Sequence, residues 1–355
     1  MPYTASISPF KLIPIVLYFL VWFAYPTNAA KAITVQAGHS IQAAIDHSGS
    51  GDLIVVNAGT YAEQLTIKTS GVSLVGIGAV IVPPRKPIQN ICSGLAGEGT
   101  ATGICIAGDN VKLAPFKQEH RKVLSVGKRV TDVSVTGFTV RNFTGIDIAI
   151  VGAEGAQVRG NHLINGAQYG ALTVGSNNTQ IDGNIVTFTR ELGFIALCMD
   201  DAGGAQVTNN IISGYAVGLC VQTPGADVRH NTVTDCCNGA YVDPGVHAAE
   251  VSHNHISSGK PLCASIPEVG IAGIVVAGSI GTEVRSNLIE DLHTPNMTGA
   301  GIAIVDFTDP VNIAMNNTVS ENVLRNNDFD IFVNTTGKGN VATGNTCSTP
   351  QNLCS

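Results

Sequence analysis

A short repeated unit limits what this chain can fold into. The unit reads V-x-x-N-x-(I/L/V), and its asparagine recurs at Asn161, Asn184, Asn210, Asn231, Asn254, Asn287 and Asn322. Each copy is followed by a second short apolar stretch, such as GALTV, GFIALCM, GLCV or GAYV. Strands this short cannot bury an apolar face alone, but they can when they stack as successive coils. The repeat therefore predicts an all-β chain folded as a parallel solenoid.

The repeated asparagine is expected to have a structural role. In a stacked solenoid it falls at the same turn of every coil, where side-chain amides can hydrogen-bond to one another and to the backbone. A leucine-rich horseshoe is excluded because no L-x-x-L-x-L frame accompanies the repeat. A β-propeller would need longer antiparallel blades joined by hairpins.

The segment ITVQAGHSIQAAIDHSGSGDLIVVNAGTYAEQLTIKTSGVSLVGIGA, near the N-terminus, resembles the first coils of the pectate-lyase-like right-handed parallel β-helix superfamily. The resemblance implies a single β-helix domain over residues 31–355, with about 10 coils and a short capping helix near Ser40 to Asp46. It also implies that Tyr61 and Glu63 belong to a structural first-coil signature. The superfamily contains lyases, hydrolases, epimerases and binding proteins, so it leaves the chemistry open.

Residues 1–30 are predicted to be a secretory signal peptide. Lys11 precedes the apolar run LIPIVLYFLVWFAYP and the small-residue region TNAAKA, which is the order of a signal sequence. The apolar run is shorter than the roughly 20 residues of a membrane span. We expect a secreted protein without stable membrane insertion after cleavage.

Charge and cysteine content narrow the partners and the compartment. The formal net charge of −7 argues against nucleic acid as a partner. Nine cysteines in a secreted chain predict disulfides, with Cys92–Cys105 and Cys347–Cys354 as candidate pairs. Cys198 and Cys220 either form a disulfide, with Cys236 and Cys237 as alternative partners, or pack as small apolar residues. Glycosylation is expected at sequons beginning at Asn142, Asn177, Asn296, Asn316 and Asn334.

Stacking the coils predicts columns of outward-facing side chains, because strand residues alternate between faces. One column contains Thr173, Cys198, Cys220 and Tyr241, and a second contains Gly175, Asp200, Gln222 and Asp243. Asp306 extends the second column if its coil keeps the same register. Asp200 and Asp243 are then separated by two strand spacings, about 9.6 Å between backbones, which suits a pair of carboxylates flanking a glycosidic bond.

Two local motifs carry functional resemblances. The pair Asp200 and Asp201 resembles the paired aspartates of polygalacturonase-type hydrolases. The segment YVDPGVH, from Tyr241 to His247, resembles the Tyr-Gly-x-Asp-Pro-His-Asp signature of alginate C5-epimerases, although the Tyr-to-Asp spacing is one residue shorter and Gly245 follows the proline. An aspartate after a strand is also a common turn residue, so the turn interpretation stays open for each of them.

We therefore predict a secreted carbohydrate-active enzyme: a polysaccharide lyase, hydrolase or uronan epimerase. The candidate catalytic residues are Asp200, Tyr241, Asp243 and His247, and the candidate substrate-binding residues are Asp201, Gln222, Asp306 and Arg229. Arg229 could bind a uronate carboxylate, or could be a solvent-facing charge. The alternatives are an isomerase or cyclase for a small secreted metabolite and a non-catalytic wall-binding protein.

No cofactor is required by this prediction. Oxygen ligands from Asp200, Asp201 and Asp243 would suit a Ca²⁺ ion. We expect a monomer whose ligand is a polysaccharide or a small molecule.

Overall fold

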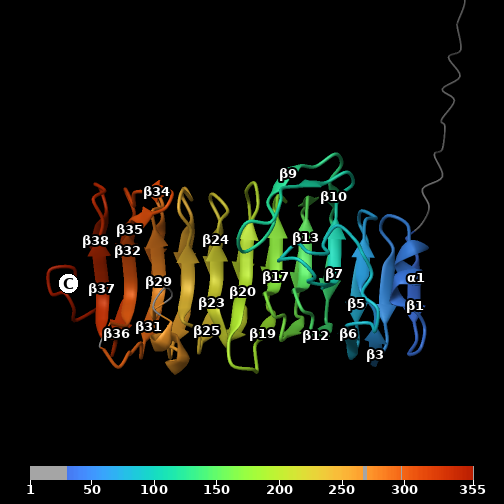
Figure 1. Ribbon diagram of the computed structural model, residues 1–355, viewed down its shortest axis with the longest axis horizontal. Helices are drawn as coiled ribbons and strands as arrows, with labels where there is room; N and C mark the ends of the chain where they lie inside the picture. Colours follow the sequence, from blue (N-terminus) through green and yellow to red (C-terminus); the bar gives the residue numbers. More distant parts are fainter. Residues whose placement is uncertain (1–29, 267–269, 297, 355) are drawn as a thin grey trace, which may run out of the picture.

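The computed structural model describes residues 30–266, 270–296 and 298–354. Except for its last residue, the predicted signal peptide lies outside these ranges. The described chain forms one long stack of parallel strands with the N-terminal coils at one end and the C-terminal coils at the other (Figure 1). Neighbouring strands in each of the three main sheets come from successive coils. The prediction of an all-β parallel β-helix is confirmed.

Three sheets, here named A, B and C, form the walls of the solenoid. The strands of sheet A are β1 (Ala32–Val35), β2 (Leu53–Val56), β5 (Ser73–Gly76), β11 (Ser134–Thr136), β15 (Gln157–Arg159), β18 (Gln180–Asp182), β21 (Gln206–Thr208), β24 (Asp227–Arg229), β27 (Glu250–Ser252), β30 (Glu283–Arg285), β35 (Thr318–Ser320) and β38 (Val341–Thr343). The strands of sheet B are β3 (Gly59–Ala62), β6 (Ala79–Val82), β12 (Thr139–Arg141), β16 (His162–Ile164), β19 (Ile185–Thr187), β22 (Ile211–Ser213), β25 (Thr232–Thr234), β28 (His255–Ser257), β31 (Leu288–Glu290) and β36 (Val323–Arg325). The strands of sheet C are β4 (Leu65–Ile67), β7 (Thr102–Ala107), β13 (Ile146–Val151), β17 (Tyr169–Val174), β20 (Gly193–Asp200), β23 (Tyr215–Val221), β26 (Asn238–Val242), β29 (Ala272–Ala277), β32 (Ala300–Val305) and β37 (Phe329–Asn334).

The first apolar residue of each repeat unit forms the core beneath sheet A. It occupies the middle of its strand, and in every copy it is fully buried: Val158, Ile181, Val207, Val228, Val251, Val284 and Val319. Burying each of these side chains contributes about 1.5–3 kcal/mol. Most flanking positions of the same strands are more exposed, as in β15, where Gln157 and Arg159 flank Val158; Ser252 of β27 is buried. This alternation fixes the register of the coils, because a slip by one residue would expose the valine column.

The repeated asparagines form the predicted ladder between sheets A and B. All seven are buried, and each side-chain amide donates to the side-chain oxygen of the asparagine one coil further on, at distances such as 3.0 Å from Asn231 to Asn254. The same amide of Asn231 also donates to the Val207 carbonyl at 2.9 Å. These bonds satisfy the polar groups that the turn would otherwise bury unpaired.

The predicted capping helix is α1 (Ile41–Asp46), and Ser40 is its N-cap. The Ser40 hydroxyl accepts from the Ala43 amide at 3.1 Å, and the Glu63 carboxylate accepts from the Ile41 and Gln42 amides at 3.0 Å. A carboxylate at a helix N-terminus satisfies free amides and is favoured by the helix dipole. Glu63 therefore stabilises the end of the solenoid. Among the described residues, no helix is long and apolar enough to cross a bilayer.

A few elements lie outside the three sheets. They are β8 (Lys112–Leu113), β9 (Val123–Ser125), β10 (Val130–Thr131), β14 (Ala153–Glu154), β33 (Phe307–Thr308), β34 (Val311–Asn312) and a 3-10 helix, Pro261–Ser265. Residues 108–129, inserted between β7 and β10 and here called the arm, include the antiparallel pair β8–β9. Figure 1 shows β9 rising beside the ends of the neighbouring coils.

Four disulfides join the described cysteines. Both predicted candidate pairs, Cys92–Cys105 and Cys347–Cys354, are present. Cys198 and Cys220 are bonded across adjacent coils, as one of the two predicted alternatives. Cys237 pairs with Cys263, which was not predicted, and Cys236 is a free, buried thiol.

Candidate functional site

The predicted polar column exists at the ends of β20, β23 and β26. Cys198 pairs with Cys220, and Cys220 pairs with Tyr241, so Asp200, Gln222 and Asp243 follow at equivalent places in three successive coils. The coil before them was misaligned by one residue. Val174 pairs with Asp200, and Thr173 pairs with Met199 and is fully buried. Gly175 therefore lies outside the column.

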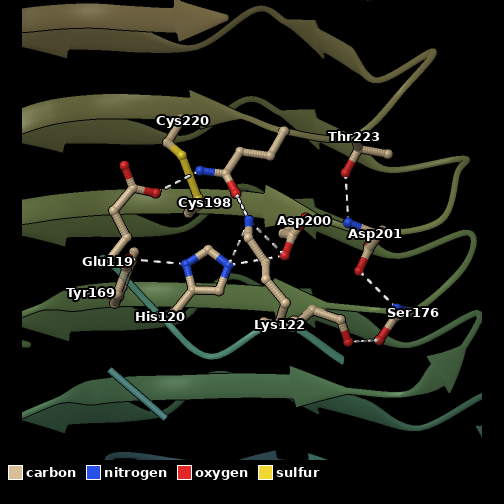
Figure 2. Close-up of polar contacts among 12 residues, drawn as sticks. Glu119, His120, Lys122, Tyr169, Ser176, Cys198, Asp200, Asp201, Cys220 and Thr223 are labelled. Atoms are coloured by element: carbon tan, nitrogen blue, oxygen red, sulfur yellow. Dashed lines mark hydrogen bonds and ion pairs between the residues drawn. A yellow bond between two sulfur atoms is a disulfide. The ribbon is translucent and has the colours of Figure 1, made fainter. Parts of the chain in front are cut away.

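The arm adds three residues that the column analysis missed. Glu119, His120 and Lys122 lie over sheet C, beside Tyr169 and Asp200 (Figure 2). The Nε2 atom of His120 lies 3.0 Å from Oδ2 of Asp200, and its Nδ1 atom lies 3.2 Å from the Tyr169 hydroxyl. Because the His120 side chain is fully buried, these two contacts fix the orientation of the imidazole and hold Asp200 in place.

Lys122 and Gln222 link the two predicted carboxylates. The ammonium of Lys122 lies 3.1 Å from Oδ2 of Asp200 and donates to Oε1 of Gln222 at 2.5 Å. The amide of Gln222 donates in turn to Oε2 of Glu119 at 2.6 Å (Figure 2). A carboxylate oxygen of Glu119 and one of Asp243 lie within 4.8 Å of each other. One charged network therefore spans three coils and the arm.

The environments of the two column aspartates differ. Burial, and next the nearby charge of Glu119, raise the pKa of Asp243 to about 8. Asp243 is therefore largely protonated at neutral pH. Asp200 instead forms an ion pair with Lys122 and contacts His120. Two carboxyl groups in environments this different can act as an acid and a base.

Two tyrosines complete the surroundings of the network. Burial, followed by the charge of Asp243, raises the pKa of Tyr241 to about 12. Burial, followed by the charge of Glu119, also raises the pKa of Tyr169. Both phenols are therefore neutral over the physiological range and can donate hydrogen bonds.

Asp201 faces the turn and lies apart from the network. It is buried, and its carboxylate accepts from the Ser176 amide at 3.0 Å and from the Thr179 hydroxyl at 2.5 Å. Its own amide donates to the Thr223 hydroxyl at 2.8 Å (Figure 2). Burial raises the pKa of Asp201 to about 6. These contacts are those of a turn residue, which the sequence had left as the alternative.

Asp306 does not extend the column. Val276 pairs with Ile304, so Ala277 and Val305 occupy the column and Asp306 lies one residue beyond it. The Asp306 carboxylate accepts from Ala314, Thr335 and Thr336 in the following turns, which lowers its pKa to about 2. The sequence allowed two registers for this coil, and the structure has the one that excludes Asp306 from the column. The prediction that Asp306 extends the column is therefore wrong.

Arg229 and His247 also lie away from the network. Arg229 is the last residue of β24 in sheet A and pairs with Asp227 at 3.2 Å, as a surface charge. His247 is exposed in the turn after β26. It is absent from the described residues that line the two cavities next to the column.

The network borders a cavity of about 530 Å³, which lies between the arm and the β33–β34 hairpin. Its lining comprises Gln118, Glu119, Lys122, Phe194, Ile195, Ala216, Val217, Cys220, Asn238, Tyr241, Asp243, Pro244, Phe307, Pro310 and Asn312. A side pocket of about 160 Å³ shares Lys122, Asp243 and Pro244 with it and adds Asp200 and Gln222. Volumes of about 300–1,000 Å³ are typical of sites for small ligands.

The predicted Ca²⁺ ligands are not gathered at one point. Asp201 faces its turn, and the Lys122 ammonium lies against Asp200 and Gln222. Glu119, Cys220 and Asp243 have potential ligand atoms close together, but the sulfur of Cys220 is bonded to Cys198. Calcium binding stays a prediction. Asp243 and Glu119 are the carboxylates of this group whose oxygen atoms lie close to each other.

Comparisons with known proteins agree with the fold. Residues 195–352 match the family model described as a right handed beta helix region, and no curated protein sequence matches the chain. DFA-IIIase from Arthrobacter chlorophenolicus A6 in complex with GF2 superimposes with a TM-score of 0.54 at 13% identity, over 88% of this chain and 89% of that one. The family 28 exopolygalacturonase of Yersinia enterocolitica gives 0.50 at 12%, over 89% and 79%. The Dettilon tailspike protein gp208 gives 0.50 at 13%, over 83% and 60%. The predicted fold is confirmed: the chain has the right-handed parallel β-helix fold that these solved structures share.

Proposed function

We propose that the protein is a secreted carbohydrate-active enzyme that cleaves or transfers a glycosidic bond at Asp200 and Asp243. The observation that carries this proposal is the contrast between the two aspartates. Asp243 is protonated at neutral pH because burial and Glu119 raise its pKa to about 8, whereas Asp200 is paired with Lys122. Glycoside cleavage needs one carboxylic acid and one carboxylate on opposite sides of the bond.

The roles follow from the charges. Asp243 would donate its proton to the glycosidic oxygen, so that the leaving sugar departs as an alcohol. Asp200 would activate a water molecule that attacks the anomeric carbon, since two strand spacings, about 9.6 Å between backbones, leave room for water. His120 and Tyr169 act as positioning residues, because they hold Asp200 through hydrogen bonds.

The charge of the cavity favours a neutral sugar over a uronate. A uronan lyase or epimerase needs a cation that neutralises the substrate carboxylate and the enolate derived from it. Among the described residues that line the two cavities, Lys122 is the one cation, and it is engaged with Asp200 and Gln222. Arg229 lies on another sheet. These observations support glycoside hydrolysis or transfer within the predicted group of reactions.

Secretion and the substrate class have independent support. Four disulfides are typical of oxidising compartments, which agrees with the predicted signal peptide and N-glycosylation sequons. The fold is shared with an exopolygalacturonase and with DFA-IIIase, and that similarity supports a carbohydrate substrate.

A second candidate is an isomerase or cyclase of a small secreted metabolite. The observation that favours it is the partly apolar cavity between the arm and the β33–β34 hairpin. The same acid and base would then move protons within one molecule. The products distinguish the two candidates, because hydrolysis releases a new reducing sugar and isomerisation conserves the mass of the substrate.

The test is an activity screen of the secreted protein. Neutral glycans, short glycosides, uronans and metabolite extracts are incubated with the wild type and with Asp200→Asn and Asp243→Asn variants. Asp235→Asn is the matched control, because Asp235 is exposed and lines neither cavity. We expect turnover of a neutral glycoside that both site variants reduce by at least about a hundredfold. Unimpaired turnover by Asp200→Asn would refute the proposed role of Asp200.

A further inference from the structure

The outer face of sheet C carries an apolar stripe that the arm covers only in part. The column of Leu172, Cys198 and Cys220 is buried, together with Tyr169 and Ile195. The covering side chains from the arm are Val111, Leu113 and Val123, which pack against this cluster. An apolar surface on the outside of a solenoid is expected to be covered by something, because its exposure to water is unfavourable.

The cavity begins where the cover of the arm ends. Its apolar wall is formed by the start of β20 and β23, with Phe194, Ile195, Ala216 and Val217. Phe194 remains 37% exposed, which is a large exposed fraction for a phenylalanine next to a core cluster. Phe307 and Pro310 of the β33–β34 segment also line this cavity.

The strand residues that line the cavity change in character along the strands: their apolar and polar side chains lie at opposite strand ends. Val217 lies near the start of β23 and Gln222 directly follows its end. The two residues are five positions apart in the sequence, or about 16 Å along the strand. Asp200 and Asp243 lie at the same ends of their coils as Gln222. Asn238, at the start of β26, is the polar strand residue at the apolar end. The strand residues of the lining are therefore apolar at the starts of the strands, apart from Asn238, and polar at their ends, where Phe307 and Pro310 of the hairpin add apolar surface.

We propose that the apolar end of the cavity is a subsite for an apolar group of the substrate, so that the substrate is a small aryl or alkyl glycoside. The sugar lies against Asp200 and Asp243, and the apolar group contacts Phe194, Ala216 and Val217. An internal segment of a polysaccharide would need hydroxyl-binding groups on both sides of the reacting bond. The charged network supplies hydroxyl-binding groups on one side of the reacting bond alone. This inference rests on the proposed function.

The experiment compares binding of paired probes. Methyl and p-nitrophenyl glycosides of glucose, galactose, mannose and fructose are titrated calorimetrically into the Asp243→Asn variant, which lacks the proton donor. At least one p-nitrophenyl glycoside is expected to bind about tenfold more tightly than its methyl counterpart. Adding Phe194→Ala should remove this difference and leave the affinity for the methyl glycoside unchanged.

The matched control is Phe332→Ala, because Phe332 is 43% exposed on β37 and lies outside this cavity. It should keep the full preference for the aryl group. Val217→Thr, which conserves shape, serves as a second variant and should weaken aryl binding several-fold. Equal affinity for both members of every pair, no binding at all, or insensitivity to both wall variants would overturn the inference. If the aryl preference is found but the wild type cleaves none of the probes, the apolar subsite stands and the proposed hydrolysis fails.

Discussion

The sharpest test of the site is the replacement of Glu119 by glutamine. Glu119 is on the arm, and its carboxylate raises the pKa of Asp243, second only to burial. The Glu119→Gln variant keeps the size of the side chain and an oxygen that can accept from the Gln222 amide, a bond of 2.6 Å in the wild type. It removes the negative charge. The pKa of Asp243 should therefore fall, and with it the pH above which the proposed acid loses its proton.

The size of the effect follows from the geometry. Oxygen atoms of Glu119 and Asp243 lie within 4.8 Å, and two like charges at that distance repel by about 3.5 kcal/mol at an effective dielectric constant of about 20. Because about 1.4 kcal/mol corresponds to one pH unit, this repulsion, before screening by solvent, corresponds to a shift of about 2.5 pH units in the pKa of Asp243. Solvent reaches part of Glu119 and screens the pair, so we expect about one to two pH units.

The assay is the pH dependence of kcat/KM on a glycoside identified in the activity screen. The alkaline limb reports the acid of the free enzyme, and we expect it near pH 8 in the wild type, where the pKa of Asp243 lies. It should move to lower pH in Glu119→Gln. Carbon-13 NMR titration of the aspartate carboxyls gives the same information without substrate. Glu98→Gln, at an exposed site outside this cavity, should leave the limb in place. An unchanged or raised limb in Glu119→Gln would show that Asp243 is not the acid.

Three further predictions address the charge network, the pH dependence of folding and the ladder. Lys122→Met should move the alkaline limb to higher pH, because Lys122 lowers the pKa of Asp243; a limb that moves down would contradict the network. The unfolded chain releases the Asp243 proton near pH 4 and the folded chain only near pH 8, so the contribution of Asp243 to folding stability is greatest below pH 4 and falls by about 1.4 kcal/mol per pH unit between these values. Urea titrations should show that Asp243→Asn lacks this part of the slope. Asn231→Ala should lower the free energy of unfolding by about 2–4 kcal/mol, because it leaves the Asn210 amide and the Val207 carbonyl without their buried partners; a loss below about 0.5 kcal/mol would show that the ladder is not a stabilising element.

The fold could be predicted because its determinants are local and repeated. Every V-x-x-N unit places a core residue and a ladder asparagine at fixed spacing, so the register of one coil determines that of the next. The column of Asp200, Gln222 and Asp243 followed from the same logic. The prediction of this column failed at Asp306. There β33 and β34 follow β32 directly, and the sequence alone does not show where β32 ends.

The arm could not be predicted, for a different physical reason. Residues 108–129 contain no repeat, and their contacts join residues far apart in the chain. Glu119 meets Gln222 at a separation of 103 residues, and His120 meets Asp200 at a separation of 80. Asp201 could have been assigned from alternation alone. If Met199 faces the core and Asp200 faces out, then the next residue turns back inward, where Ser176 and Thr179 bind it.

The proposed acid and base therefore depend on the arm and the column together, since neither would supply both by itself. On a bare solenoid, Asp200 and Asp243 would be two solvated aspartates at the ends of strands, with similar charges at neutral pH. The arm brings Lys122 against Asp200 and Glu119 against Asp243, and it also removes water from their surroundings. Burial, and next the charge of Glu119, raise the pKa of Asp243, whereas Asp200 is held in an ion pair with Lys122. The different surroundings of Asp200 and Asp243, on two coils of the same repeat, thus arise from an insertion whose sequence shows no relation to that repeat.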